Sequence, residues 1–276
     1  MAEWAWPANA RLAWIEACLA RGVSSFDHAD IYGGYAVETL FGEALALKPG
    51  LRERMQIISK CGIRLVHPAW PATRSQHYDT SRAHIVRSVE NSLRALRTDR
   101  LDLLLIHRPD ALMDADEIAE AVAALKRAGK VLSFGVSNFT RDQFELLEAV
   151  TPLATNQIEW HPLHLAPLTD GTLDQAQRLK RRPTIWSPLA GGRLFTAADA
   201  QAQRVRQALA EAGEAHGASI TTAAYAWLLR HPSRPIPIVG SRRLDALDEA
   251  LAALSWRMEA ETWWGIWQAS TGHGVP

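Results

Sequence analysis

Residues 101–110 read LDLLLIHRPD. The mainly apolar run Leu101–Ile106 ends at the polar residue His107. A short apolar run of this kind is typical of a parallel strand that is buried on both faces. Enzymes built on parallel barrels carry their functional side chains where such strands end. The stretch therefore predicts a strand of a parallel sheet and one candidate site residue, His107.

Strand-like and helix-like segments alternate on both sides of this stretch. Strands are predicted at residues 25–27, 56–60, 101–106, 133–136, 154–158, 184–186 and 236–239. Helices are predicted at residues 9–21, 37–47, 81–97, 116–128, 140–150, 173–181, 202–216, 220–230, 244–252 and 260–268. Repeated β-α-β crossovers favour a (β/α)8 barrel of the TIM type over a doubly wound sheet, and no G-x-G-x-x-G follows the first strand. We therefore expect an α/β protein with one barrel domain over residues 1–276.

The strand count falls one short of a closed barrel, because seven strands are predicted and the chain starts with a helix. Only Met1–Ala8 precedes that helix, and the segment Trp4–Pro7 is too short for a strand and its connection. We expect the first strand of the barrel to be missing from this chain. The strands at Ser25 and Ile236 would then present unpaired edges, which is unfavourable in a soluble protein.

The composition is that of an ordinary globular protein. Of 276 residues, 47% are hydrophobic and 22% are charged, and 30 basic residues balance 30 acidic ones. This balance gives no basis for nucleic-acid or membrane binding, and no apolar run approaches the ~18 residues of a membrane span. The two cysteines do not predict a disulfide framework, and no secretory signal is recognisable. We expect a cytoplasmic monomer without nucleic-acid or membrane partners.

Four polar residues fall where predicted strands end or just beyond: Asp27, Tyr32, Lys60 and His107. A tyrosine can give its proton to a carbonyl oxygen, and a lysine cation beside it favours the phenolate that remains. An aspartate can keep a buried lysine charged, and a histidine can orient the carbonyl and stabilise its developing negative charge. Together the four residues predict a reductase of aldehydes or ketones.

Each of these residues has a simpler interpretation when it is taken alone. Asp27 could cap a turn, Tyr32 could anchor a loop, and Lys60 could form an ion pair at a strand end. His28 and Asp30 lie in the same segment as Asp27 and compete with it for the role of the aspartate. Only the combination of residue types, in this order, favours catalysis.

Seven segments between Ser25 and about Ala250 resemble the aldo-keto reductase superfamily, specifically its bacterial oxidoreductase branch. In the family's order they are FDHADIYGGY, IISKCGI, LDLLLIHRPD, FGVSNFT, TNQIEWHP, WSPLAGGRLF and PIPIVGSRR. The resemblance implies a barrel that binds NADP(H) and a small-molecule carbonyl substrate, and it is the reason for preferring Asp27. Family members carry a hairpin and a first strand before the helix at residues 9–21. This chain lacks that segment, in agreement with the strand count.

The resemblance also implies residues that bind the nicotinamide. Ser137, Asn138 and Gln157 match the groups that bind its carboxamide. Trp186 occupies the position of a ring that stacks on the nicotinamide face, although a plain core tryptophan is an alternative.

Two further segments match the family's contacts to the rest of the cofactor. The segment around the pyrophosphate includes Ser187, Leu189, Gly191 and Arg193, and its small residues would let backbone N–H groups approach phosphate. The residues before the helix at 244–252 are Gly240, Ser241, Arg242 and Arg243. A helix N-terminus with two arginines suits a phosphate dianion, which favours NADP over NAD. Relatives often place longer polar side chains at the positions of Ala246 and Ala250, which would weaken this preference.

The substrate pocket is not determined by the sequence. Residues 67–77, Trp160 and the group Trp263, Trp264 and Trp267 are candidates to line it, but packing is the favoured role of the last three. We expect no metal, because the histidines do not form a compact H-x-x-x-H pair and the cofactor carries the hydride.

Two alternatives to a reductase remain open. The protein could be an NADP(H)-binding sensor or accessory subunit, a role that the superfamily also contains, or the chain could be a non-functional fragment. Retention of all four candidate catalytic residues argues against a purely non-catalytic role.

Overall fold

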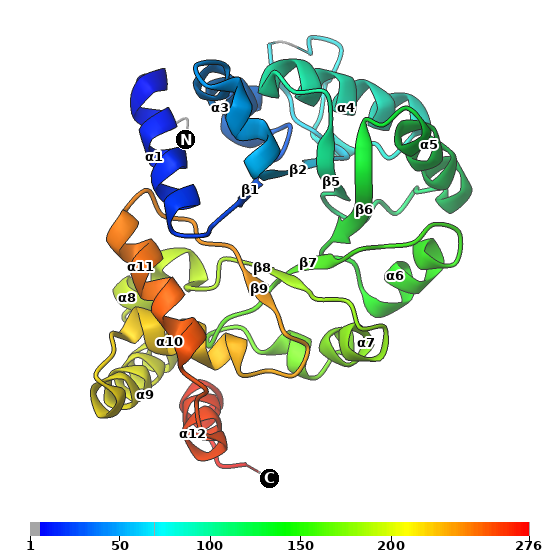
Figure 1. Ribbon diagram of the computed structural model, residues 1–276. Coiled ribbons are helices and arrows are strands. Elements are labelled where there is room, and N and C mark those ends of the chain that lie inside the picture. The colour runs from blue at the N-terminus through cyan, green and yellow to red at the C-terminus, as the bar shows by residue number, and fades with distance from the viewer. Residues whose placement is uncertain (1–5, 69, 276) are drawn as a thin grey trace. The chain divides into compact units, whose positions relative to one another are not determined.

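The computed structural model describes residues 6–68 and 70–275, and its chain divides into two compact units, Met1–Asn156 and Gln157–Pro276. In each unit, parallel strands alternate with helices (Figure 1). Within the described ranges, no helix is long and apolar enough to cross a membrane.

The first unit contains four parallel strands that neighbour one another in chain order. They are β1 (Ser25–Asp27), β2 (Gln56–Cys61), β5 (Leu101–Ile106) and β6 (Val131–Ser137). The register pairs Asp27 with Ile58 and Lys60 with Leu105. It therefore brings the carboxyl ends of β1, β2 and β5 to one edge of the sheet, where polar side chains follow the strands.

Helices accompany these strands. They are α1 (Ala8–Ala20), the single turn α2 (Tyr32–Tyr35), α3 (Val37–Ala46), α4 (Arg82–Leu96), α5 (Ala115–Arg127) and α6 (Arg141–Glu148), with a 3-10 helix at Pro49–Arg54. Side-chain caps set several N-termini. Ser81 and Asp114 cap α4 and α5, and Thr140 forms a capping box with Gln143 at α6.

The first unit also contains a short hairpin that the sequence did not reveal. β4 (His77–Tyr78) pairs antiparallel with β3 (Ile63–Arg64), in the register Ile63 to Tyr78. Two-residue strands show no detectable alternation of polar and apolar residues, so their sequence gives no signal.

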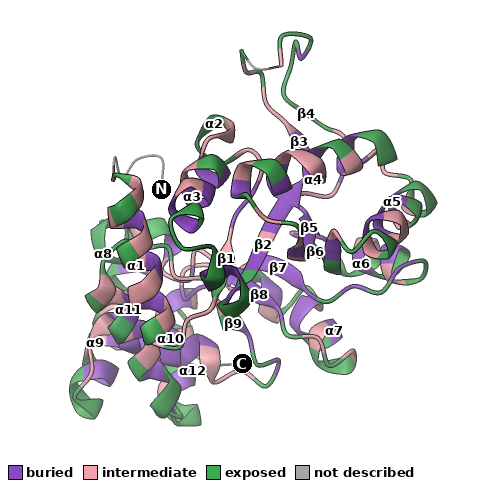
Figure 2. Cartoon of the chain, turned by 45° about the horizontal axis from the view of Figure 1, so that its top comes forward, coloured by how far each residue is buried: buried purple, intermediate pink, exposed green. Residues whose placement is uncertain are grey.

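The core of the first unit lies between the strands and the inward faces of the helices. In Figure 2 the strands are largely in the colour of buried residues, and the outward faces of α4 and α5 are exposed. Phe41 of α3, Ile85 of α4 and Ile118 of α5 are completely buried. Burial of these apolar faces is the main force that holds the helices on the sheet.

The second unit contains β7 (Asn156–Glu159), β8 (Thr184–Trp186) and β9 (Ile236–Pro237), which pair parallel in chain order. Its helices are α7 (Thr172–Arg178), α8 (Arg193–Thr196), α9 (Ala200–His216), α10 (Ile220–Leu229), α11 (Leu244–Ala252) and α12 (Ala260–Thr271). Short 3-10 helices lie at Ala166–Leu168, Ala190–Gly192 and Ala253–Ser255.

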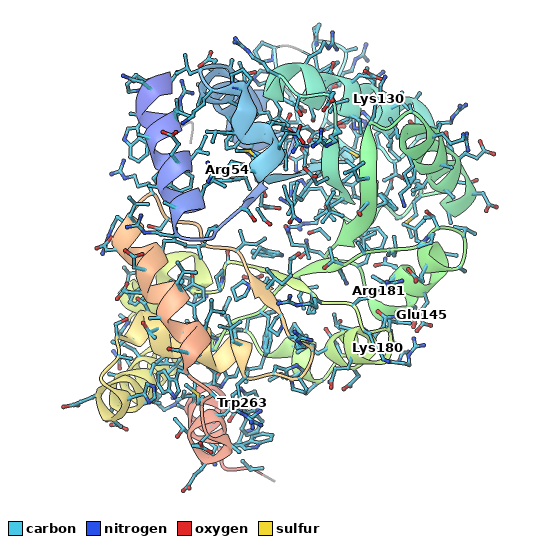
Figure 3. All side chains as sticks on the ribbon, viewed as in Figure 1. Arg54, Lys130, Glu145, Lys180, Arg181 and Trp263 are labelled. Carbon is cyan, nitrogen blue, oxygen red and sulfur yellow. The ribbon has the colours of Figure 1, made fainter. Side chains whose placement is uncertain are left out.

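Tryptophans form much of the core of this second unit. The rings of Trp227 and Trp263 stack with centroids 5.0 Å apart, and each indole N–H donates to the other residue's backbone carbonyl, at 3.1 and 3.0 Å. Trp160 is completely buried with its ring 5.4 Å from that of Trp227. Trp263, which lies on α12 and is labelled in Figure 3, therefore has the packing role that the sequence favoured.

All seven predicted parallel strands are present, and β1, β5 and β8 have the predicted bounds. The described residues before α1 contain no strand. Part of the segment Trp4–Pro7 lies outside the described residues. β1 and β9 are only three and two residues long, and short edge strands limit pairing with other chains. The single-domain interpretation stays a prediction.

Gly42 marks a very close approach of α3 to the C-terminal end of α4. A Cβ atom at this position would lie 2.1 Å from the backbone oxygen of Ala95 and 2.8 Å from the carbonyl carbon of Leu96. Backbone atoms cannot move aside as a flexible side chain can, so any larger residue would push the two helices apart.

We predict that Gly42→Ala lowers the free energy of unfolding by about 1–3 kcal/mol, because overpacking outweighs the roughly 1 kcal/mol that alanine gains in helix propensity. Urea denaturation followed by circular dichroism would measure the change. Gly50→Ala is the matched control, since a Cβ atom at Gly50 would meet no atom within 4 Å. Equal stabilities of the two variants would contradict the predicted clash.

Candidate active site

Lys60 is a deeply buried cationic side chain at the strand ends of the first unit. It lies near the end of β2, and its side chain has 0% exposure. Its Nζ donates to Asp27 Oδ2 at 2.6 Å, to the backbone oxygen of His28 at 2.8 Å and to Tyr32 Oη at 3.2 Å. Three acceptors match the three N–H bonds of an ammonium group. The arrangement therefore favours a charged lysine despite its burial.

Tyr32 lies in a turn with an unusual backbone. Gly33, Gly34 and Tyr35 follow it with φ values of 59°, 61° and 67°, all in the left-handed region. Glycine adopts this region without steric cost. Tyr35 does not, but its hydroxyl accepts a hydrogen bond from Leu65 N at 3.0 Å, which helps to hold the turn. The turn leaves Tyr32 36% exposed, while its hydroxyl accepts a hydrogen bond from the buried Lys60.

His107 follows β5 and contacts the ring of Tyr32. The two ring centroids are 5.7 Å apart in an edge-to-face arrangement, and the backbone N–H of His107 donates to Cys61 O at 2.8 Å. Burial, followed by the positive charges of Lys60 and Arg108, lowers the pKa of His107 to about 3. The imidazole is therefore neutral at ordinary pH and can donate one hydrogen bond from its ring.

The structure thus brings Asp27, Tyr32, Lys60 and His107 together within the first unit. A proton donor, a cation beside it and a neutral hydrogen-bond donor lie next to one another. Such a group can protonate an oxygen atom that acquires negative charge and can stabilise the tyrosine anion that is left.

His28 and Asp30, the competitors of Asp27, make different contacts. The ring of His28 packs edge-on against Phe41 of α3 at 4.5 Å, and burial together with Lys60 lowers the pKa of His28 to about 3. Asp30 accepts a hydrogen bond from the Ser88 hydroxyl at 2.6 Å. Asp27 is therefore the carboxylate that pairs with Lys60.

Two candidate cofactor residues also lie in the first unit. Ser137 ends β6 and is buried, and Asn138 follows it with a left-handed φ of 61°. The Asn138 side-chain amide donates to Ser137 Oγ at 2.7 Å. These neighbouring hydroxyl and amide groups have the donors and acceptors that a carboxamide requires.

In the second unit, the candidates of residues 157–193 lie on strands β7 and β8 or follow β8. Gln157 is buried on β7, and Trp186 ends β8 opposite Glu159. Beyond it, Ser187 and Gly191 have left-handed φ values of 50° and 61°. The Ser187 carbonyl accepts from Ala190 N, and the Leu189 carbonyl accepts from Gly192 N.

The tight turns of this segment leave space beside the backbone. A Cβ atom built at Gly191 or Gly192 would have no atom within 4 Å. Arg193 then opens α8 and lies 3.5 Å from Asp199 in an exposed ion pair. An open, glycine-containing turn followed by an arginine fits a phosphate group.

Gly240, Ser241, Arg242 and Arg243 precede α11. The first turn of α11 has no side-chain cap, and Ser241 Oγ instead accepts from the backbone N–H of Arg243 at 3.1 Å. Arg242 is exposed. Arg243 forms an exposed ion pair with Asp245 at 2.6 Å. The sequence interpretation did not weigh this acidic competitor, which the spacing Arg243-Leu244-Asp245 could have revealed.

Within the described part of the chain, no group of three or more histidine, cysteine or acidic side chains is arranged to hold a metal ion. Functional candidates that sequence reasoning missed are buried carboxyl groups rather than metal ligands. Asp30 was considered only as a competitor of Asp27, and Glu38 was not considered at all.

The low pKa of His107 yields a testable linkage between pH and stability. In the unfolded chain His107 takes up a proton near its ordinary pKa of about 6.5. Its contribution to stability is therefore complete above that pH and is lost as the pH falls toward 3. We expect the free energy of unfolding of the wild type to fall below pH 6, relative to His107→Asn, by about 1.4 kcal/mol per pH unit. Urea denaturation of both proteins from pH 7 to pH 5 measures the difference, and a constant difference would contradict the expectation.

Comparison with known proteins identifies the family of this chain. The sequence model of the Aldo/keto reductase family matches residues 2–269. The chain is 50% identical to the oxidoreductase YdhF of Escherichia coli, over 99% of this chain and 92% of YdhF. It is 43% identical to a 6-dehydroglucose reductase of Agrobacterium fabrum, over 95% of this chain and 88% of that one. The crystal structure of the thermostable aldo-keto reductase Tm1743 with the inhibitor epalrestat is similar with a TM-score of 0.78 and 28% identity, over 95% of this chain and 88% of that one. The protein therefore has the (β/α)8-type barrel fold and is an oxidoreductase of the Aldo/keto reductase family.

Proposed function

We propose that this protein reduces an aldehyde or ketone to an alcohol with NADPH, and that Tyr32 is the proton donor. The observation that carries the proposal is the contact of the buried Lys60 ammonium with Tyr32 Oη at 3.2 Å. Because the tyrosine oxygen accepts this hydrogen bond, the hydroxyl keeps its own proton for a substrate.

A nicotinamide, when bound, would supply the hydride that the carbonyl carbon accepts in the proposed reaction. Tyr32 gives its proton to the carbonyl oxygen, and Lys60 stabilises the phenolate that remains. Asp27 keeps Lys60 charged and oriented through the 2.6 Å ion pair. His107, neutral and 5.7 Å from the Tyr32 ring, donates a hydrogen bond to the carbonyl oxygen and stabilises its growing negative charge. Bulk solvent restores the proton to Tyr32.

The preference for NADPH over NADH rests on the segment before α11. Ser241, Arg242 and Arg243 offer a hydroxyl and two cations beside an uncapped helix N-terminus. Asp245 neutralises part of this charge through Arg243. We propose that the phosphate of NADPH displaces Asp245 from Arg243. Ser137, Asn138, Gln157 and Trp186 are proposed to hold the nicotinamide, and Ser187, Leu189, Gly191 and Arg193 the pyrophosphate.

A sugar aldehyde is the first substrate class to test. The relative from Agrobacterium fabrum is named a 6-dehydroglucose reductase. Beside the turn that carries Tyr32, the ring of Tyr35 lies 5.2 Å from that of His67 and 6.1 Å from that of Trp70. Aromatic faces of this kind suit the apolar face of a sugar ring.

We propose in addition that the protein acts as a cytoplasmic monomer folded as one domain.

We predict that Tyr32→Phe lowers kcat for NADPH-dependent carbonyl reduction by at least about 100-fold, because the proton donor is lost. The NADPH dissociation constant, followed by tryptophan fluorescence, should change little. Tyr78→Phe, which alters an exposed tyrosine on β4, should leave turnover unchanged. NADPH binding by the wild type without turnover of any aldehyde or ketone would instead support a cofactor sensor.

The cofactor preference is tested separately. We predict that Arg243→Ala weakens NADPH binding about tenfold by removing a charge-assisted hydrogen bond, and that NADH binding is unaffected. Asp245→Asn should have the opposite effect, because it removes the competitor of the phosphate. Arg257→Ala removes an equal charge from an exposed position and is the control. An equal effect of Arg243→Ala on both cofactors would place the phosphate elsewhere.

A further inference from the structure

A second group of buried polar side chains lies behind β2, on the face opposite Lys60. Ser59 precedes Lys60 in the strand, and successive side chains of a strand point to opposite faces. The Ser59 hydroxyl donates to Glu38 Oε1 of α3 at 2.5 Å, and Ser92 of α4 also hydrogen-bonds Glu38. Glu38 is buried, so α3, α4 and β2 meet at this carboxyl group.

Asp30 belongs to the same region. Ser88, one turn before Ser92 on α4, donates to Asp30 Oδ2 at 2.6 Å. The backbone N–H of Asp30 donates to the backbone oxygen of Lys60 at 3.0 Å. Asp30 Oδ1 is buried and has no hydrogen-bond partner among the described residues. A protonated carboxyl group tolerates such a site better than a carboxylate does.

The two carboxyl groups bracket the turn that presents Tyr32. Asp30 precedes Tyr32 by two residues, and Glu38 follows it by six. Between them lie the left-handed residues Gly33, Gly34 and Tyr35. The hydrogen bonds of Asp30 and Glu38 therefore attach both ends of a conformationally unusual turn to α4 and β2.

The charges of the two groups interact with each other and with Lys60. Burial raises the pKa of Asp30 to about 7, and repulsion by Glu38 adds to this effect. Burial also raises the pKa of Glu38 above its ordinary value. The positive charge of Lys60 favours the ionised forms of Asp30 and Glu38. Cys61 and Tyr35 also interact with Asp30. Burial raises the pKa values of these two groups, so they are neutral neighbours. His28 at the end of β1 is neutral as well, because burial holds its pKa near 3.

We propose that Asp30 and Glu38 are positioning residues of the reductase, that Asp30 keeps a proton at neutral pH, and that this proton controls the charge behind Lys60 and Tyr32. The pair touches neither substrate nor cofactor and acts through the turn and through Lys60. Its catalytic part rests on the proposed function, whereas the proton on Asp30 does not.

The direction of the effect follows from the charges. Loss of the Asp30 proton to solvent adds a negative charge near Lys60 and Tyr32. This charge disfavours a phenolate beside Lys60, so reduction continues at a pH where it would otherwise decline. Without the charge, the alkaline limb of kcat/KM for reduction should move to lower pH.

The first measurement is the infrared carbonyl band of protonated carboxyl groups, recorded for the full chain between pH 5 and pH 9. The wild type should show a band at pH 6 that disappears with a midpoint near the Asp30 pKa of about 7. Asp30→Asn should remove this band. Glu38→Gln should move its midpoint to lower pH, because the repulsion is gone. Ser88→Ala should move the midpoint to higher pH, since the carboxylate loses a donor.

Thermal unfolding provides a second test that does not need activity. In the unfolded chain Asp30 ionises near pH 3.9, so its stabilising contribution is complete below that pH and is lost as the pH rises to about 7. The Tm of Asp30→Asn minus that of the wild type should therefore rise from pH 4 to pH 7 and stay constant above. Asp99→Asn, which removes an exposed charge of the same unit, should show no such rise.

For catalysis, the alkaline limb of kcat/KM should move to lower pH in Asp30→Asn, by roughly 0.5 unit, less than the 1–3 units of a contacting charge. KM for the carbonyl should change little, and Asp99→Asn should match the wild type. A wild type without a titrating band that Asp30→Asn removes would overturn the proton on Asp30. Unchanged pH profiles of kcat/KM in Asp30→Asn and Glu38→Gln would overturn the catalytic part. Absence of turnover in the wild type would overturn the proposed function, while the infrared and unfolding data still decide on the pair.

Discussion

The buried ammonium group of Lys60 is the constraint on which the candidate site depends. A lysine with a completely buried side chain loses its hydration and stays charged only if acceptors replace the lost water. Here the acceptors are a carboxylate, a backbone carbonyl and a phenol, and all three come from residues 27–32. The strand that carries Lys60 and the segment that carries Tyr32 are thus held together by the same charge that the proposed chemistry uses.

Buried acidic groups on the opposite face of β2 also need hydrogen-bond partners that replace the water they lose, in this case donors rather than acceptors. Glu38 and Asp30 lie where carboxylates are poorly hydrated, and serine hydroxyls replace only part of that hydration. Residues of the segment from Asp27 to Glu38 therefore make polar contacts on both faces of β2. Asp27 and Tyr32 contact the cation Lys60 on one face, and Asp30 and Glu38 lie on the other. Burial of such groups is costly in free energy and supplies geometric specificity rather than stability.

The strands and helices were largely predictable because they follow from apolar runs and periodicity. The run Leu101–Ile106 has the bounds of β5, and the helix predicted from residue 140 begins at Arg141, after the Thr140 cap. The hairpin of β3 and β4 could not be predicted, because two-residue strands have no periodicity. The roles of Asp30 and Glu38 were equally hidden, since an acidic residue in a sequence carries no sign of its burial. Residue types could predict the proposed chemistry, but not the environment that tunes it.

The choice of Asp27 over its neighbours follows from strand register alone. Asp27 pairs with Ile58, and paired residues of adjacent strands point to the same face. Ile58 and Lys60 share a face, so Asp27 faces Lys60, whereas His28 points to the helices and contacts Phe41. A slip of one residue would exchange these faces and leave the ammonium without a carboxylate. The apolar residues that specify this register, such as the buried Phe26 and Ile57, therefore determine the proposed active site as strictly as the polar residues within it.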